Sequence, residues 1–209
     1  MKTTAIAKHH AIRNVTCLGI LTLWLAFPRV STAQTDDRSS SYTIGGNPVM
    51  SLKGSSTLHA WAMTAHAFTG DANFSLSAHH KLSAMNGFSL RLPVHNLKSK
   101  SVRTDNNAYK ALKADKYKDI VFELTSAKVT SSGSNKYRIV AQGNLTIAGV
   151  TQPTTLDASA VVHADGTISC SGAVPVYLAD YSIARPTFML GTMKVDDLTT
   201  LTYSLLFVQ

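Results

Sequence analysis

Hydrophobic and polar residues alternate with a period of two along most of the chain, most clearly over residues 137–147. The odd positions of that stretch are apolar or small: Tyr137, Ile139, Ala141, Gly143, Leu145 and Ile147. Because successive side chains of a strand point to opposite faces, the pattern predicts a strand with one buried face. Residues 148–151 predict a tight turn, and the apolar positions of 154–162 predict a returning strand. Together they predict a β-hairpin.

Shorter alternating stretches predict further strands, with a turn at Gly45–Pro48 after the first of them. These strands are expected over residues 42–44, 49–53, 67–76, 88–94 and 120–125, from 168 onwards, and over 201–207. One segment breaks the period and predicts a short helix from about Thr104 to Ala114. The whole pattern is typical of an all-β protein, an antiparallel barrel with one short helix.

The inward face of the predicted hairpin mixes large residues with small ones such as Ala141, Gly143 and Ala158. Small side chains on a barrel wall leave room for a ligand cavity, as in lipocalins. They also simply fit the taper of a closed barrel. The residues alone leave both interpretations open.

The N-terminal segment has the features of a secretory signal peptide: basic residues, then the apolar run Val15–Phe27, then the small residues Ser31–Ala33. A membrane anchor is the alternative, but the run of 13 residues is shorter than the ~18 that a spanning helix needs. We therefore expect a periplasmic or extracellular protein. The expected segments are a signal peptide over 1–33, a polar tether over 34–41 and one folded domain over 42–209.

Composition adds little support for a nucleic-acid partner. The formal charge of the chain is +8, but residues 1–33 hold four cations and no acidic residue, so their removal lowers it to +4. We find no helix-turn-helix or zinc-finger pattern, and we expect no nucleic acid to bind. Cys170 is the only cysteine after residue 33, which rules out a disulfide within the folded domain.

Several segments carry fixed residues at fixed spacing. Gly143–Asp157 reads G-x-LTI-x-GVT-x-P-x-x-LD, and Gly54–Trp61 reads G-x-S-x-LH-x-W. Both resemble segments of the YceI-like family, and the run Tyr109–Tyr117 is similar to the family's short helix that closes one end of the barrel. Tyr177–Thr192 resembles a third family segment, so the resemblance covers about residues 42–208. Ala60 stands where a branch of the family often has an acidic residue.

The resemblance implies a lipocalin-like barrel around an elongated apolar tunnel, and some family members carry polyisoprenoid chains such as isoprenoid quinones. For this chain it implies an exported protein that sequesters or carries an isoprenoid or other lipid chain. It implies no enzyme activity and no cofactor besides such a lipid. The expected tunnel residues are Trp61, Phe68, Phe74, Phe122, Leu145, Ile147, Phe188 and Tyr203. The expected mouth, facing the ligand's head group, comprises His59, Tyr109, Lys110 and Lys113.

Other functions are weighed against this one. The main alternative is a ligand-free structural or interaction module of the cell envelope, whose interior is filled by its own side chains. The basic helix is either a solvated face or a site for an anionic head group or peripheral membrane contact. Cys170 has no flanking motif of a thiol nucleophile. Four histidines, His59, His66, His79 and His80, fall within 22 positions but match no metal-ligand spacing.

Overall fold

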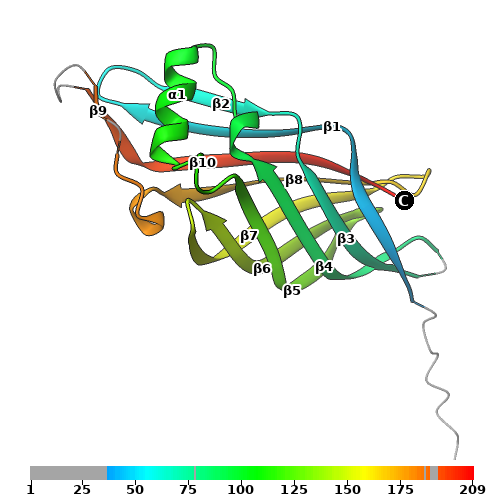
Figure 1. Cartoon of the computed structure of the whole chain (residues 1–209). Coiled ribbons are helices and arrows are strands. Elements are labelled where there is room, and N and C mark those ends of the chain that lie inside the picture. The colour runs from blue at the N-terminus through cyan, green and yellow to red at the C-terminus, as the bar shows by residue number, and fades with distance from the viewer. Residues whose placement is uncertain (1–36, 78, 186, 189–192) are drawn as a thin grey trace, which may run out of the picture. The chain divides into compact units, whose positions relative to one another are not determined.

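The computed structural model describes residues 37–209 except 78, 186 and 189–192 (Figure 1). These residues belong to one compact unit, Thr35–Gln209. The predicted signal peptide lies outside the described residues. In chain order the elements are β1 (Arg38–Ser56), β2 (Trp61–Ala65), β3 (Thr69–Leu76), β4 (Leu82–Pro93), η1 (Val94–Asn96), α1 (Val102–Ala111), β5 (Asp119–Gly133), β6 (Lys136–Ile147), β7 (Val150–Val162), β8 (Ile168–Tyr177), η2 (Ala179–Tyr181), β9 (Thr187–Phe188) and β10 (Met193–Val208).

Eight strands close into an antiparallel barrel in the order β1-β3-β4-β5-β6-β7-β8-β10, and β10 returns to pair with β1. The predicted hairpin is β6–β7, which pairs from Lys136–Val161 to Ile147–Val150 without a register shift. The expected all-β barrel with one short helix is therefore confirmed. No helix in the described part of the chain is long and apolar enough to cross a bilayer.

The first strand differs from the sequence-based expectation. β1 begins at Arg38, so the last residues of the expected tether are already paired with β3. The segment Gly45–Pro48 is not a turn but a bulge within β1, because the register against β10 shifts between Gly45 and Val49. Gly46 has a φ of 65°, a left-handed conformation that glycine adopts without strain. The bulge lets a single strand continue where two were predicted.

The two halves of β1 have different neighbours on the side away from β10. The first half pairs with β3, from Arg38–Leu76 to Thr43–Asp71. The second half pairs with β2, from Met50–Ala65 to Gly54–Trp61, and beyond β2 an isolated bridge joins Thr64 to Lys98. Helix α1 lies beside β1 and β2 at this end of the barrel (Figure 1). The helix therefore covers the barrel end where strand pairing is sparse.

Aromatic side chains fill the middle of the barrel and the end away from α1. Phe74 is fully buried and meets Tyr42 and Phe207 edge to face, at centroid separations of 5.4 and 5.3 Å. Phe88 continues the cluster to Phe207 at 5.7 Å and to Phe122 at 5.8 Å. Such geometries are favourable for aromatic pairs and bury large apolar areas. This part of the interior is packed with the protein's own side chains.

Glycines on the barrel wall make room for aromatic rings rather than for a void. A Cβ added to Gly143 would lie 2.5 Å from the ring of Phe122, and one added to Gly172 would lie 2.6 Å from that of Tyr203. Both separations are shorter than side-chain contacts allow. At these two positions the space left by the missing side chain is occupied by a neighbouring ring and is not part of a ligand cavity.

Replacing Phe74 by alanine tests the packed interior. Because the ring is fully buried, its loss leaves a cavity, and we expect the free energy of unfolding to fall by about 3–5 kcal/mol in urea titrations. Leu58→Ala removes an exposed side chain and is the matched control, with an expected change below about 0.5 kcal/mol. Equally small losses in both variants would contradict a filled interior.

Candidate functional site

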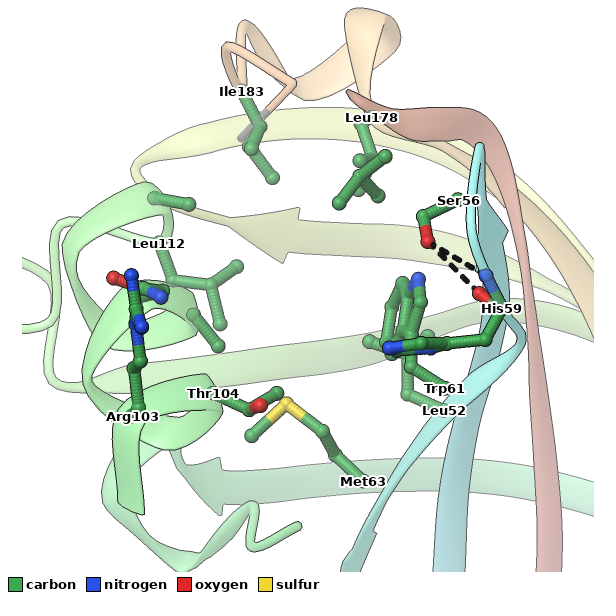
Figure 2. Close-up of a pocket in the computed structure, with 14 residues that line it drawn as sticks. Leu52, Ser56, His59, Trp61, Met63, Arg103, Thr104, Leu112, Leu178 and Ile183 are labelled. Atoms are coloured by element: carbon green, nitrogen blue, oxygen red, sulfur yellow. Dashed lines mark hydrogen bonds between the residues drawn. The ribbon is translucent and has the colours of Figure 1, made fainter. Parts of the chain in front are cut away.

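A pocket of about 280 Å³ opens between α1, the β1–β2 hairpin and the η2 segment. Figure 2 shows Leu112, Leu178 and Ile183 projecting into it from two sides, with Trp61 and Met63 opposite α1. Most of its wall is apolar. The lining residues are Leu52, Ser56, His59, Trp61, Met63, Arg103, Thr104, Asn107, Ala108, Ala111, Leu112, Leu178, Ile183 and Val195. The arrangement suits the apolar part of a small amphipathic molecule.

Trp61 forms the wall opposite the helix. It is the first residue of β2 and pairs with Gly54 of β1. Its indole lies so close over Gly54 that a Cβ there would be 2.7 Å from the indole Cε2. The indole Nε1 donates a hydrogen bond to the Ser55 carbonyl oxygen at 3.2 Å. The glycine and this hydrogen bond fix a flat apolar surface in the pocket, with the polar edge of the indole satisfied.

His59 is held at the mouth by the short loop between β1 and β2. The Ser56 hydroxyl donates to the His59 carbonyl oxygen at 2.9 Å, and the Ser56 backbone N–H donates to the same oxygen at 3.1 Å. The His59 Nδ1 lies 3.0 Å from the Ala60 carbonyl oxygen. Position 60 is alanine and offers no side-chain carboxylate, so the partner of the imidazole is this backbone oxygen. His59 remains exposed.

Helix α1 is tied to the preceding segment along the side away from the pocket. The Ser101 hydroxyl caps its start by accepting from the Thr104 N–H at 3.4 Å, and the buried Asp105 carboxylate accepts from the Ser99 N–H at 2.7 Å. Farther along, the Tyr109 hydroxyl donates a shared hydrogen bond to the carbonyl oxygens of His95 (3.1 Å) and Leu97 (2.8 Å). These bonds orient the helix so that Thr104, Ala108 and Ala111 face the pocket.

The expected tunnel residues divide into three groups. Trp61 lines the pocket. Phe188 lies in β9, and its side chain falls outside the described part of the structure. The others are buried in the core and do not line the pocket, because their rings and aliphatic chains pack against one another: Phe68, Phe74, Phe122, Leu145, Ile147 and Tyr203. The hollow therefore lies nearer to α1 than the expected tunnel.

Of the residues expected at the mouth, only His59 lines the pocket. Tyr109 faces the 95–98 segment, with its ring 4.5 Å from that of His95 and the Lys98 Nζ 5.3 Å above it. Lys110 and Lys113 are exposed and do not line the pocket. The helix contributes Arg103 instead.

Sequence reasoning missed several lining residues. Thr104 lies four positions before Ala108, Asn107 four before Ala111, and Arg103 four before Asn107. Residues four apart share one face of a helix, so the helical period was the signal that could have found them. Arg103 is the one lining residue with a permanent charge, and it is exposed at the edge. Leu178 and Ile183 flank η2, a turn that hydrophobic alternation does not predict.

Two kinds of reactive centre, an activated cysteine and a metal site, find no support among the described residues. Burial raises the pKa of the Cys170 thiol to about 12, so its reactive thiolate is scarce at neutral pH. Burial likewise raises the pKa of the Tyr203 hydroxyl, which donates to the Asp157 carbonyl oxygen at 3.4 Å. Among the residues that the structure describes, no three His, Cys, Asp or Glu side chains gather as a metal would require.

A second hollow of about 270 Å³ lies where β7 and β8 diverge. These strands pair only from Ala158–Gly172 to Val162–Ile168. The Gln152 side-chain amide spans the gap by donating to the Asp180 carbonyl oxygen at 2.8 Å. Much of this wall is polar, from Gln152, Thr154, Thr155 and Asp180. It fits an apolar ligand less well than the pocket beneath α1.

Residues 36–207 match the family model of the YceI-like domain. Burkholderia cenocepacia BcnA has a similar fold, with a TM-score of 0.60 at 15% identity, covering 76% of this chain and 95% of that chain. A polyisoprenoid binding domain from Saccharophagus degradans, implicated in plant cell wall breakdown, gives a TM-score of 0.58 at 10% identity, with coverages of 79% and 97%. The Campylobacter jejuni YCEI protein is 22% identical over 66% of this chain and 79% of that chain, with a TM-score of 0.49. No curated protein matches the sequence.

Asp105→Ala tests the attachment of the helix. It leaves the Ser99 N–H without its acceptor, so we expect local opening of α1 to become easier by about 1–3 kcal/mol. Hydrogen exchange should then be about 5- to 150-fold faster in α1 and unchanged in β6. Asn106→Ala, at the exposed neighbouring position, is the control. Unchanged exchange in α1 would mean that Asp105 does not hold the helix.

Proposed function

The chain belongs to the YceI-like family, and on that premise we propose that it is an exported binding protein that holds the apolar part of an isoprenoid or other lipid in the pocket beneath α1. The observation that carries this function is the pocket itself. Its wall is built from Leu52, Trp61, Met63, Leu112 and Ile183 with other apolar groups, and its one permanent charge, on Arg103, lies at the exposed edge. Such a wall favours an apolar group over a polar one by the free energy of burial.

A related structure supports the ligand class. The Saccharophagus degradans domain, which shares this fold, is described as polyisoprenoid binding. At 10% identity that likeness concerns the fold, so the lipid class for this chain rests on family membership together with the apolar pocket. Binding rather than catalysis is the function that these observations favour.

The size of the pocket limits how much of a ligand is buried. A volume of about 280 Å³ lies at the lower end of typical ligand pockets, which hold about 300–1,000 Å³. Beyond it, the aromatic cluster around Phe74 and Phe122 fills the barrel. The ligand is therefore a short apolar group, or a longer chain that enters by one end and leaves the remainder outside. This is a shorter site than a tunnel through the whole barrel.

The polar end of the ligand then lies at the mouth, beside Arg103 and His59. Both line the pocket and both are exposed, so a head group can reach them while remaining in water. The guanidinium suits a carboxylate or phosphate because it donates two parallel hydrogen bonds. Arg103 thus takes the part in head-group recognition that the sequence suggested for Lys110 and Lys113.

Ala108→Phe tests the binding pocket. Ala108 faces the pocket from α1, and a phenyl ring there occupies ligand space. Displacing apolar ligand surface equivalent to two CH₂ groups, at about 0.8 kcal/mol each, weakens binding about tenfold. The measurement is titration with the neutral fluorescent probe N-phenyl-1-naphthylamine, combined with native mass spectrometry of the purified protein for a co-purified lipid.

Asn106→Phe adds the same ring on the exposed side of the same helix and is the matched control, which should bind the probe as the unmodified chain does. Equal weakening in both variants would point to damage to the helix rather than a filled pocket. Failure of the unmodified chain to take up the probe or retain a lipid would contradict lipid binding and favour the ligand-free envelope module.

Export is part of the proposal and has its own test. The apolar run Val15–Phe27 and the small residues before Gln34 lead us to expect that the protein in the periplasm or medium begins at Gln34, as read from its intact mass. Leu21→Arg interrupts the run and should leave the uncleaved chain inside the cell, whereas Thr35→Arg, beyond the cleavage site, should not. Recovery of the uncleaved chain outside the cell would contradict a signal peptide.

A further inference from the structure

Large exposed hydrophobic side chains gather at the pocket end of the barrel. Within the described residues these are Leu58 (64% exposed), Val102 (76%), Tyr177 (46%) and Leu198 (46%). Leu58 lies in the β1–β2 loop, Val102 begins α1, and Tyr177 ends β8, where it pairs with Leu198. Single exposed apolar residues are common, but their restriction to one end, around an apolar pocket, indicates an interaction surface.

Leu58 and Val102 flank the mouth of the pocket. Leu58 directly precedes His59, and Val102 directly precedes Arg103. His59 and Arg103 are the lining residues that are exposed to solvent, so they mark where the pocket meets water. Figure 2 shows them on opposite sides of the hollow, His59 beside the β1–β2 hairpin and Arg103 on α1. One exposed aliphatic side chain therefore stands on each side of the mouth.

Cations accompany both aliphatic residues. Val102 lies between Lys100 and Arg103, and all three are exposed. On the other side, the backbone of Lys194 is joined to Thr57, the neighbour of Leu58: the Thr57 N–H donates to the Lys194 carbonyl oxygen at 3.1 Å, and the Lys194 N–H donates to the Thr57 hydroxyl at 3.2 Å. Lys194 is also exposed.

Acidic groups near this side are engaged within the protein. Asp105 is buried and accepts from the Ser99 N–H at 2.7 Å. Asp196 accepts a hydrogen bond from the Ser55 hydroxyl. These carboxylates keep their charge, so the cations on this side, Lys100, Arg103 and Lys194, outnumber them by three to two.

The other exposed pair, Tyr177 and Leu198, has an acidic setting. Asp197 directly precedes Leu198, and the exposed Asp180 follows Tyr177 by three positions. This pair therefore resembles Leu58 and Val102 in exposure but has the opposite local charge. The structure thus contains its own comparison between a basic and an acidic apolar surface at the same end of the barrel.

We propose that the basic side of the pocket mouth docks on an anionic lipid bilayer, with Leu58 and Val102 entering the interface between head groups and acyl chains. Lys100, Arg103 and Lys194 then contact lipid phosphates. Aliphatic side chains combined with nearby cations are the two signals from which reversible binding to an anionic membrane is built. Docked in this way, the mouth faces the apolar phase, so a lipid passes between bilayer and pocket without crossing water.

A bilayer fits this surface better than a protein partner does. The aliphatic side chains stand singly on two separate segments, the loop of residues 57–60 and the start of α1, rather than in one continuous patch. A fluid lipid surface adapts to such separated anchors, whereas a protein interface needs a packed apolar centre. Charge complementarity selects anionic rather than neutral lipid.

Vesicle co-sedimentation tests the docking, with vesicles of phosphatidylcholine alone or mixed with phosphatidylglycerol. We expect binding to the mixed vesicles, weak binding to the neutral ones, and a decrease with rising salt. Leu58→Asp combined with Val102→Asp should weaken binding to the mixed vesicles at least about tenfold. Lys100→Gln combined with Lys194→Gln should weaken it about tenfold.

Tyr177→Asp combined with Leu198→Asp is the matched control and should change vesicle binding less than about twofold, because that pair lies outside the docking surface. The full chain and the chain from Gln34 are compared, since the apolar run of residues 15–27 binds lipid by itself. Uptake of the neutral probe should be the same in all these variants. It reports pocket binding separately, so a failure of docking and a failure of ligand binding are distinguishable.

Three results would contradict the proposed docking on an anionic bilayer. The first is no preference of the unmodified chain for phosphatidylglycerol. The second is vesicle binding that the Leu58 and Val102 substitutions leave unchanged, which would reduce the contact to diffuse attraction by cations. The third is equal loss in the Tyr177 and Leu198 control.

Discussion

The pairing of β1 with β10 is the constraint on which the rest of the structure depends. One edge of β1 pairs with β10 from Thr43 to Ser56, interrupted at the bulge, and the other edge is divided between β3 and β2. The ring therefore closes fully only where β1 meets β3. At the other end β2 takes that place, and a helix covers what strands leave open (Figure 1). A helix packs less closely over a sheet end than another strand would, and the pocket occupies the space beneath it.

This division explains how a barrel without a disulfide in the described region tolerates a hollow. The aromatic contacts of Phe74, Phe88 and Phe207 concentrate apolar burial in the half away from α1. At the helix end, buried apolar residues such as Leu97 and Leu112 are joined by the hydrogen bonds of Asp105 and Tyr109 with the 95–99 segment. Stability is then unevenly distributed, which is the usual setting of a ligand-binding element that has to move.

The sequence predicted the strands well because alternation reports directly which face of a strand is buried. The β6–β7 hairpin was recognisable for this reason, and the helix because it interrupts the alternation, although it runs from Val102 to Ala111 rather than from about Thr104 to Ala114. Alternation cannot report whether inward residues meet one another or enclose a space. Phe122 and Tyr203 face inward as expected, yet their rings lie against Gly143 and Gly172, a pairing between strands that no single strand encodes.

The position of the cation at the pocket mouth shows a similar limit of sequence-based prediction for helix α1. Arg103 and Lys110 are seven positions apart and share one stripe of the helix, but they are separated by about 10 Å along its axis. The family resemblance implied a helix over the barrel end, but the sequence could not show which turn of that helix meets the pocket. The orientation of the helix depends on hydrogen bonds of Asp105 and Tyr109 with residues 95–99, a segment without regular hydrophobic periodicity.

A carrier of an apolar molecule has to bind its ligand and also release it, and the two demands oppose each other. Every additional buried CH₂ strengthens binding by about 0.8 kcal/mol and slows release accordingly. A pocket confined to one end limits this burial, because the aromatic cluster takes the remaining length of the barrel. On the proposed membrane docking, a mouth that carries both aliphatic side chains and cations would lower the cost of transfer, since the ligand would exchange with a lipid phase rather than with water. Under that proposal the filled interior would limit the affinity for the ligand, and the exposed residues of the mouth would shorten its path to the membrane.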